Sequence, residues 1–392
     1  MENLLILSNC CISNTESNGR IHSFLVKNDE IESIHNFYVR GNPDIDNVSY
    51  LTVAPKKALL SKITFGLVNA KLNKPVKNAN STNSLSSKSK KVFYHWIRSF
   101  AYLNNRKIIK NLREYIIFNN IDTIYLWGCN VPFLYNYAWK LAKKNNLNLV
   151  TFTGEDYPLK NYNYISFKRS IFFPCFQRRF FKETRKVYEL SNTNYFANKE
   201  LCELYKNRIN LKHFDLCYFK SELERVNKTT NSIRNLIYAG NLYDARAVTL
   251  LKFASYLEKF SDVVINVYGN AHEDVVSKLN SSKNIKYHGI VPYSELLEIL
   301  KTNDMLLHIE GFDKDFVNDF KYAFSTKISD YFALGMPMFV YGPIEISGVK
   351  FCKEMIPNFT ACTYEELQKL DDIISGKVKF DFDYNIVERL FK

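Results

Sequence analysis

The sequence lacks any long apolar segment and any cysteine motif. No stretch reaches the roughly 18 consecutive apolar residues that a membrane-spanning helix needs, so we expect no transmembrane span. The eight cysteines are scattered and only Cys10 and Cys11 are adjacent. No C-x-x-C pair or Cys/His cluster occurs, which argues against a metal site. The first eight residues carry an acidic side chain and only a short apolar run, so we expect no signal peptide. These absences predict a reduced, cytoplasmic protein whose membrane contact is at most peripheral.

A dinucleotide-binding fingerprint is also missing, because no G-x-G-x-x-G occurs in the chain. What the chain has is size and positive charge. Its 392 residues exceed what one hydrophobic core usually organises, so we expect two domains. Hydrophobic residues make up 46%, enough for a large core. The 53 lysines and arginines against 40 acidic residues give a formal net charge of +13. This balance favours an anionic partner: nucleic acid, an acidic membrane face or phosphorylated substrates.

Short apolar runs alternate with amphipathic segments in the first half of the chain. This alternation is typical of a parallel, doubly wound sheet, so we predict an α/β domain of the Rossmann type. The run 21–26 indicates a helix after the first loop. The other expected elements are strands 4–7, 34–39, 121–128 and 147–152 and helices 108–118, 132–144 and 200–206.

The second half repeats this alternation and predicts a second Rossmann-like domain. A polar and charged segment, 220–232, is interpreted as the linker. We therefore place the domains at 1–225 and 226–392, with the last helix expected to pack back on the first domain. The expected elements are strands 235–239, 263–269, 285–289 and 305–309 and helices 246–260 and 294–301, the latter with Ser294 as N-cap.

Two polar loops follow strands of the first half. Parallel sheets bind ligands beyond the carboxyl ends of their strands, where 128–130 and 153–158 should lie. Glu155 and Asp156 are adjacent carboxylates in the second loop. They are candidates for acid/base or hydroxyl-binding work, and an ordinary acidic loop cap is the alternative.

Two segments combine aromatic and basic residues. The first, 92–103, follows a stretch rich in Asn, Ser and Lys, and it is compatible with either a core helix or a helix on a membrane surface. The second, 167–186, alternates phenylalanines with cations. Its phenylalanines could be core residues below a solvated basic face, or they could insert into an anionic membrane, which we prefer. Stacking of single-stranded nucleic acid is a third and less favoured interpretation.

The stretch 321–343 predicts a helix start that can bind an anion. Ser325 is a candidate N-cap, and Gly335 and Pro337 should end the helix before a buried strand. Thr326 and Lys327 add a hydroxyl, backbone N–H groups and a cation to the positive end of the helix. Asp330 lies about one turn further on, where a carboxylate could accept hydrogen bonds from sugar hydroxyls.

A matching loop follows the strand 235–239. Gly240 allows a phosphate to approach the backbone, Asn241 comes next, and Arg246 begins the following helix with a bidentate guanidinium. Together with Lys327 and the helix start at Ser325, these groups could hold a diphosphate without a metal ion.

On these motifs the second half resembles the carboxyl-terminal domain of a GT-B glycosyltransferase similar to family 4. The resemblance is carried by 238–246, by 288–296 and by 325–337. The first half resembles the matching domains of bacterial surface-polysaccharide enzymes through 17–20, 38–44 and 153–157. Such enzymes transfer a sugar from a nucleotide diphosphate sugar in the cleft between two Rossmann-like domains, usually with retention and without a bound metal or other cofactor.

The resemblance implies roles for individual residues. Gly240, Arg246 and Lys327 would face the donor diphosphate, Ser325 and Thr326 would donate hydrogen bonds to it, and Asp330 would hold the ribose. On the acceptor side it implies Gly19 and Arg20. The family usually has two glutamates eight positions apart, whereas this chain has Tyr322 at the first place and Asp330 at the second; Glu310 is the candidate substitute.

The sequence therefore predicts a hexosyltransferase-type glycosyltransferase (EC 2.4) that acts at the inner face of the cell membrane. Its expected partners are a nucleotide sugar, a lipid-linked glycan of a capsule or O-antigen, and an anionic membrane surface contacted by 92–103 and 167–186, without nucleic acid. A non-catalytic, glycosyltransferase-like binding partner is the alternative, and the missing first glutamate is its best support.

Overall fold

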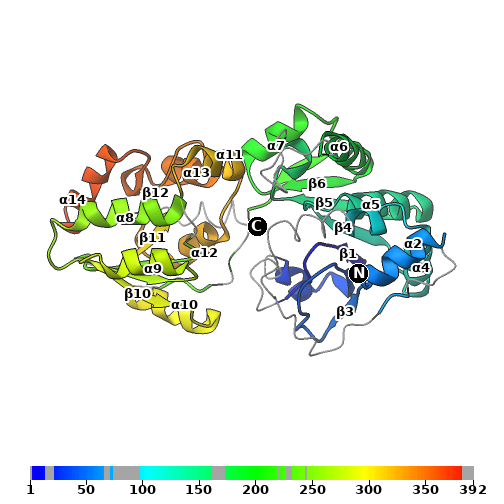
Figure 1. Cartoon of the computed structure of the whole chain (residues 1–392), viewed down its shortest axis with the longest axis horizontal. Coiled ribbons are helices and arrows are strands. Elements are labelled where there is room, and N and C mark those ends of the chain that lie inside the picture. Colours follow the sequence, from blue (N-terminus) through cyan, green and yellow to red (C-terminus); the bar gives the residue numbers. More distant parts are fainter. Residues whose placement is uncertain are drawn as a thin grey trace. The chain divides into compact units, whose positions relative to one another are not determined.

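The computed structural model confirms an α/β chain with two parallel sheets, one in each of two compact units, Met1–Leu216 and Cys217–Lys392 (Figure 1). The residues that the structure describes are 2–13, 22–65, 71–73, 98–160, 173–218, 221, 223–226, 232–242 and 245–381.

The first unit contains a seven-stranded, fully parallel sheet in the order β3-β2-β1-β4-β5-β6-β7. The direction of the crossovers reverses between β1 and β4, which is the topological switch point of the sheet. The central strands are apolar and buried on both faces, as covered parallel strands require. The strands are β1 (Glu2–Leu7), β2 (Ile31–Phe37), β3 (Val48–Leu51), β4 (Thr123–Trp127), β5 (Asn148–Thr153), β6 (Thr193–Phe196) and β7 (Phe214–Leu216).

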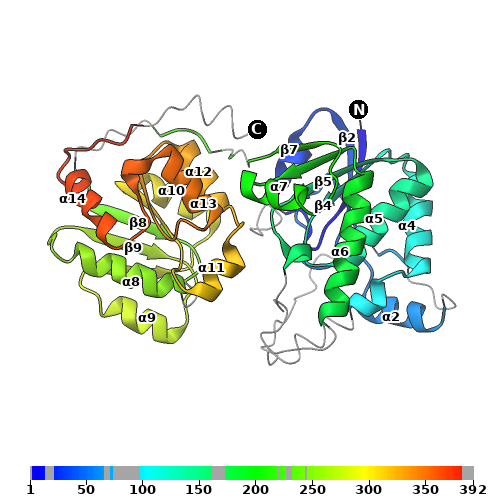
Figure 2. The same cartoon turned by 90° about the horizontal axis from the view of Figure 1, so that it is seen from above.

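Helices of the first unit cover the sheet, with α4, α5 and α6 lying side by side (Figure 2). The residues 21–26 were expected to form a helix, and the described part forms the 3-10 helix η1 (Ser23–Lys27). The remaining elements are α2 (Pro55–Ile63), α4 (Arg106–Phe118), α5 (Pro132–Asn145), η2 (Tyr157–Leu159), α6 (Phe173–Leu190) and α7 (Lys199–Lys206).

The second unit contains a six-stranded parallel sheet in the order β10-β9-β8-β11-β12-β13, with its switch point between β8 and β11. Figure 2 shows α8 and α9 on one face of this sheet and α10 and α12 on the other. The strands are β8 (Asn235–Ala239), β9 (Val264–Tyr268), β10 (Ile285–Gly289), β11 (Met305–Ile309), β12 (Met338–Tyr341) and β13 (Thr360–Ala361). The helices are α8 (Ala245–Leu257), α9 (Glu273–Asn280), α10 (Tyr293–Thr302), α11 (Lys314–Phe320), α12 (Thr326–Leu334), α13 (Ser347–Met355) and α14 (Lys369–Ile374), with the 3-10 turns η3 (Pro357–Phe359) and η4 (Glu365–Gln368).

Three predicted strands of the second unit, 235–239, 285–289 and 305–309, occur with the predicted bounds. The predicted N-cap Ser294 is wrong, because α10 begins at Tyr293 and Pro292 occupies the N-cap position. The strand predicted after Pro337 is β12, at Met338–Tyr341. Elements that were not predicted include the short β3, β7, α11 and β13 and the helices α2, α9, α13 and α14.

The segment after Leu216 packs on the second unit, although the sequence assigned residues up to 225 to the first domain. The ring of Tyr218 lies 5.2 Å from that of Phe324 and 5.3 Å from that of Phe351. The N–H of Val226 donates to the carbonyl of Leu334 at 2.8 Å. These contacts explain why the units divide at 216/217 rather than at 225/226. The last helix expected by the sequence, after 381, lies outside the described residues.

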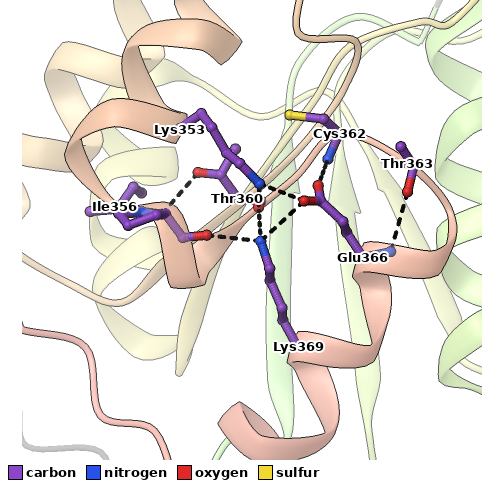
Figure 3. A network of polar contacts seen from close by, with 8 residues as sticks. Lys353, Ile356, Thr360, Cys362, Thr363, Glu366 and Lys369 are labelled. Atoms are coloured by element: carbon purple, nitrogen blue, oxygen red, sulfur yellow. Dashed lines mark hydrogen bonds and ion pairs between the residues drawn. The ribbon is translucent and has the colours of Figure 1, made fainter.

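A charged network ties the carboxyl-terminal part of the second unit together (Figure 3). Glu366 accepts from Lys353 Nζ at 2.7 Å and from the backbone N–H of Cys362 at 2.6 Å. Lys369 Nζ donates to the carbonyl of Thr360 at 2.8 Å. The network connects α13, β13 and the segment η4–α14 to one another.

The two aromatic and basic segments are only partly described, as 98–103 and 173–186. In α6, Phe173 and Phe180 are buried, whereas Arg178, Lys182 and Arg185 are exposed. These two phenylalanines therefore belong to the core, so the predicted membrane insertion cannot use them. None of the helices in the described ranges has the length and apolar character that crossing a bilayer requires.

Candidate functional site

The switch point of the second sheet brings two loops together. β8 and β11 are neighbours, so Gly240 and Glu310, which directly follow them, lie at the same carboxyl edge. Ligands of open α/β sheets bind at this place. Two backbone segments pack closely at this edge. Gly269, with φ +144°, lies so near Gly240 that a Cβ on Gly269 would be 1.9 Å from the carbonyl oxygen of Gly240.

The amino end of α12 offers unsatisfied donors, as the sequence predicts. Ser325 is the N-cap residue, with φ −73° and ψ 129°, but its hydroxyl accepts no capping hydrogen bond. The N–H of Ile328 donates to the carbonyl of Ser325 at 3.0 Å. Among the described residues, no acceptor faces the backbone N–H groups of Thr326 and Lys327. A helix start with free N–H groups and the positive end of the helix dipole is suited to bind an anion.

Lys327 extends its ammonium over Gly240. A Cβ at position 240 would be 2.0 Å from Lys327 Nζ, so only glycine leaves room for it. Nζ also lies 5.5 Å from the ring centroid of Tyr238. In the described part of the chain no carboxylate lies within ion-pair distance of this ammonium. Burial, and to a smaller extent the charge of Arg246, lowers the pKa of Lys327 to about 8.

Arg246 is held by Glu310. Its Nε donates to Oε2 at 2.9 Å and its Nη2 donates to Oε1 at 3.1 Å, a bidentate pair between side chains 20% and 5% exposed. Burial opposes ionisation of Glu310, but the hydrogen bonds and charges of His308 and Arg246 outweigh it and lower its pKa. Glu310 is therefore an ionised partner of Arg246 and a poor source of protons.

Three residues of this site were missed by the sequence analysis. His308 lies in β11 with Nε2 3.3 Å from Glu310 Oε1, and burial lowers its pKa. The guanidinium carbon of Arg246 lies 5.2 Å from the ring of Phe316 and 5.5 Å from that of Phe320. A lone histidine in an apolar strand and two phenylalanines at i, i+4 were the available signals. Neither signal indicates which arginine these residues contact.

The remaining residues predicted to bind the donor are near the same helix and loop. Asp330 Oδ1 accepts from the hydroxyl of Ser221 at 2.7 Å. Asn241 is exposed, and its carbonyl accepts from Tyr238 Oη at 3.2 Å. Tyr322, at the position where the family has a glutamate, is half-buried.

The candidate residues of the first unit are in different surroundings. Asp156 is buried and lies 3.4 Å from Lys160 Nζ, an ion pair that favours the structural interpretation of this carboxylate. Glu155 is half-buried, and its carbonyl accepts from Tyr205 Oη at 3.2 Å. Gly19 and Arg20 lie outside the described residues.

Within the described ranges, no set of three or more His, Cys, Asp or Glu side chains is placed so that it could hold a metal ion. The charged groups at the edge of the second sheet include two cations, Lys327 and Arg246, the second of which is paired with Glu310.

No protein-family model matches the chain, and no curated protein matches its sequence. Solved structures do match. Sucrose-phosphate synthase from Thermosynechococcus elongatus aligns with a TM-score of 0.58 at 10% identity, over 100% of this chain and 95% of that chain. The apo form of the lipopolysaccharide outer core galactosyltransferase WaaB gives 0.58 at 10% identity, over 99% and 94%. TarM gives 0.58 at 9% identity, over 100% and 95%. At such identities the likeness shows the fold, and it confirms the predicted GT-B fold with its two Rossmann-like domains.

Proposed function

We propose that this protein is a glycosyltransferase that transfers a sugar from a nucleoside diphosphate sugar to a glycan acceptor. One observation carries the proposal: the ammonium of Lys327, which forms no ion pair in the described part of the chain, lies over Gly240 beside the open start of α12. The place is the switch point of a Rossmann-like sheet, where a diphosphate fits by charge and by hydrogen-bonding capacity. The likeness to a galactosyltransferase and a sucrose-phosphate synthase is consistent with this chemistry.

In this proposal the second unit stabilises the leaving group. Negative charge grows on the diphosphate as the bond to the sugar breaks, and preorganised donors aimed at that charge lower the barrier. The N–H groups of Thr326 and Lys327, the Ser325 and Thr326 hydroxyls and the Lys327 ammonium supply such donors. No metal is required for this step. We also propose metal independence, retention of configuration and hexosyl transfer, which the resemblance to family 4 enzymes implies.

Arg246 acts as a second cation whose position is fixed. Glu310 occupies Nε and Nη2 of its guanidinium and the rings of Phe316 and Phe320 flank it, which leaves Nη1 to face a ligand. We assign Glu310 to the positioning of Arg246 rather than to proton transfer, because both of its oxygens are engaged. Asp330 keeps its role as the candidate partner of the ribose hydroxyls, with Asn241 beside the diphosphate.

The acceptor side is proposed to be the first unit. Glu155 is the better candidate for contact with an acceptor hydroxyl, since the carboxylate of Asp156 is paired with Lys160. We propose a lipid-linked glycan of surface-polysaccharide synthesis as the acceptor. The enzyme would then work on the inner face of the membrane.

Exposed apolar side chains next to cations support this location. Phe65 is 99% exposed at the end of α2 and Phe100 is 59% exposed, with Lys62 Nζ 5.6 Å from the Phe100 ring. Such a surface attracts anionic lipid by charge and gains from burial of the aromatic rings. Co-sedimentation with phosphatidylglycerol vesicles tests it: Phe65→Glu with Phe100→Glu should reduce binding, and undiminished binding would contradict it.

The function itself is tested by Arg246→Ala and Lys327→Ala in assays of donor hydrolysis and sugar transfer. Both changes should reduce turnover by at least about tenfold each, because each removes a charged contact to the diphosphate. Unchanged turnover would refute the site.

The second candidate function is a non-catalytic binding partner with a glycosyltransferase fold. It is favoured by Tyr322 at the place of a glutamate and by the occupied carboxylate of Glu310. Calorimetry with a panel of nucleotide sugars separates the two functions, since a partner that has lost catalysis and donor binding would bind none of them.

A further inference from the structure

The first sheet has its own switch point, and two arginines lie there. β1 and β4 are neighbours, and the residues that follow them, up to Cys10 and including Cys129, lie at one carboxyl edge. This is the edge at which the first unit would receive a ligand. The function proposed above places Glu155, which follows β5, at this carboxyl edge and assigns no role to the two arginines.

Arg40 is fixed at this edge by the backbone. Its N–H donates to the carbonyl of Asn9 at 3.0 Å, and its carbonyl accepts from the N–H of Cys11 at 3.0 Å. Its Nε donates to Cys10 Sγ at 3.3 Å, whereas the rest of the side chain is exposed. The guanidinium is thus tethered at Nε to Cys10, beyond the end of β1, and the residue is exposed.

Arg98 reaches the same edge from a short helical segment, 98–102. Tyr102, one turn after Arg98, donates its hydroxyl to the carbonyl of Val53 and stacks on Phe133 at 4.6 Å between ring centroids. Phe133 is in the first turn of α5, which directly follows the β4 loop. The packing of Tyr102 therefore fixes this helical segment against the start of α5.

Arg40 and Arg98 lie within electrostatic range of each other, and neither forms an ion pair in the described part of the chain. Burial and the charge of Arg40 lower the pKa of Arg98, so the like charges lie within electrostatic range. Arg98 Nε is buried and has no hydrogen-bond partner among the described residues, an arrangement that costs free energy. Within the described ranges neither arginine has a carboxylate at ion-pair distance. The nearby Cys129 does not neutralise them, because burial raises the pKa of its thiol to about 12.

A third positive element adjoins the pair. α5 is 14 residues long and begins at Pro132, and its N-cap Val131 has no side chain that caps the helix. The positive end of its dipole therefore points to the edge at which Arg98 lies. Two arginines and a helix start together match an anion with several oxygens and more than one negative charge.

We propose that Arg40 and Arg98 form a binding subsite for a phosphate or diphosphate ester carried by the acceptor. This inference rests on the proposed glycosyltransferase function, because it names the substrate class of the first unit. The acceptor would then be a phosphorylated glycan or a glycan on a phosphate-linked carrier, and the pair would bind its phosphate group.

Calorimetry on the full chain tests the subsite with inorganic pyrophosphate as the probe. The titration is made with saturating nucleoside diphosphate present, so that the second unit is occupied. Wild type should bind pyrophosphate, and Arg40→Gln with Arg98→Gln should weaken it about tenfold for each arginine. The affinity for nucleoside diphosphate should not change. Arg40→Lys and Arg98→Lys keep the charge and should give intermediate affinities.

A matched control and three outcomes keep the proposal refutable. Arg185→Gln removes an arginine of the same unit that is 58% exposed and paired with Glu189, and it should leave pyrophosphate binding unchanged.

Undiminished binding in the double variant would overturn the subsite. Tighter binding of glucuronate than of pyrophosphate would overturn the phosphate class. Loss of nucleoside diphosphate affinity would show that the pair serves the donor instead. If wild type binds no nucleoside diphosphate, the proposed function fails, and the pyrophosphate titration still reports on the arginines separately.

Discussion

The ammonium of Lys327 occupies the space that a side chain on Gly240 would need, since a Cβ there would be 2.0 Å from Nζ. The two residues come from different elements, the end of β8 and the first turn of α12. Gly240 therefore fixes where the cation of the candidate anion site lies.

Gly240→Ala should displace Lys327 and weaken nucleoside diphosphate binding by about tenfold, the effect of losing one charged contact. The fold should tolerate the change, because the displaced atom is the end of a flexible chain. Calorimetry measures the affinity for nucleoside diphosphate, and urea unfolding measures the stability of the fold. Gly154→Ala, where a Cβ would meet only Phe152 Cε1 at 3.6 Å, is the control and should leave this binding unchanged. Wild-type affinity in Gly240→Ala would contradict the arrangement.

A pH series tests the charge of Lys327. Its pKa in the folded protein is lowered to about 8, chiefly by burial, so the ammonium is present below that pH and is lost above it. Nucleoside diphosphate affinity should therefore decline above pH 8, by up to about tenfold per pH unit. Lys327→Arg keeps its charge in this range, so its affinity should stay flat. A wild-type affinity that is equally flat from pH 7 to 9.5 would exclude the ammonium as a ligand group.

A double-mutant cycle on the free energy of unfolding can test the Arg246–Glu310 pair. Glu310→Gln should lower the free energy of unfolding by about 2–4 kcal/mol, because it leaves the partly buried guanidinium without its counter-ion. The same change should weaken nucleoside diphosphate binding by freeing Arg246 to move. Adding Arg246→Met should recover part of the stability and none of the affinity. Strictly additive unfolding energies would show that the two side chains do not depend on each other.

Asp330 is tested by a comparison of ribose with deoxyribose. Wild type should bind a ribonucleoside diphosphate more tightly than its 2′-deoxy counterpart, because the carboxylate accepts from the ribose hydroxyls. Asp330→Asn should reduce this preference to near zero. Ser221→Ala is the control, since it removes only the hydroxyl that contacts Asp330 Oδ1. An undiminished preference in Asp330→Asn would assign ribose recognition elsewhere.

Local patterns predicted much of the fold. Apolar runs identified β8, β10 and β11 with their bounds, and the group Ser325–Lys327 identified the start of α12, because these features depend on neighbours in sequence. The pairing of Arg246 with Glu310 was not predictable, since the residues are 64 positions apart and only the sheet order brings them together.

The sequence of α6 shows a second limit of prediction, which concerns whether its phenylalanines are buried or exposed. Phenylalanines alternating with cations can either cover a membrane or form a core below a solvated face, and composition alone does not decide between them. Phe173 and Phe180 are buried in the structure, so these two phenylalanines form part of the core. Similarly, nothing local in the sequence connects Arg40 with Arg98, whose proximity depends on β2 and on the packing of Tyr102.

The central claim is that the edge of the second sheet binds the diphosphate of a sugar donor. Calorimetric titration of the full chain with a panel of nucleoside diphosphates and their sugars tests it most directly. Wild type should bind at least one of them, and Arg246→Ala and Lys327→Ala should each weaken it about tenfold or more. Lys259→Ala, which removes a cation just beyond the other end of α8, should not change it. Binding that survives both substitutions, or the absence of binding by any member of the panel, would contradict the account.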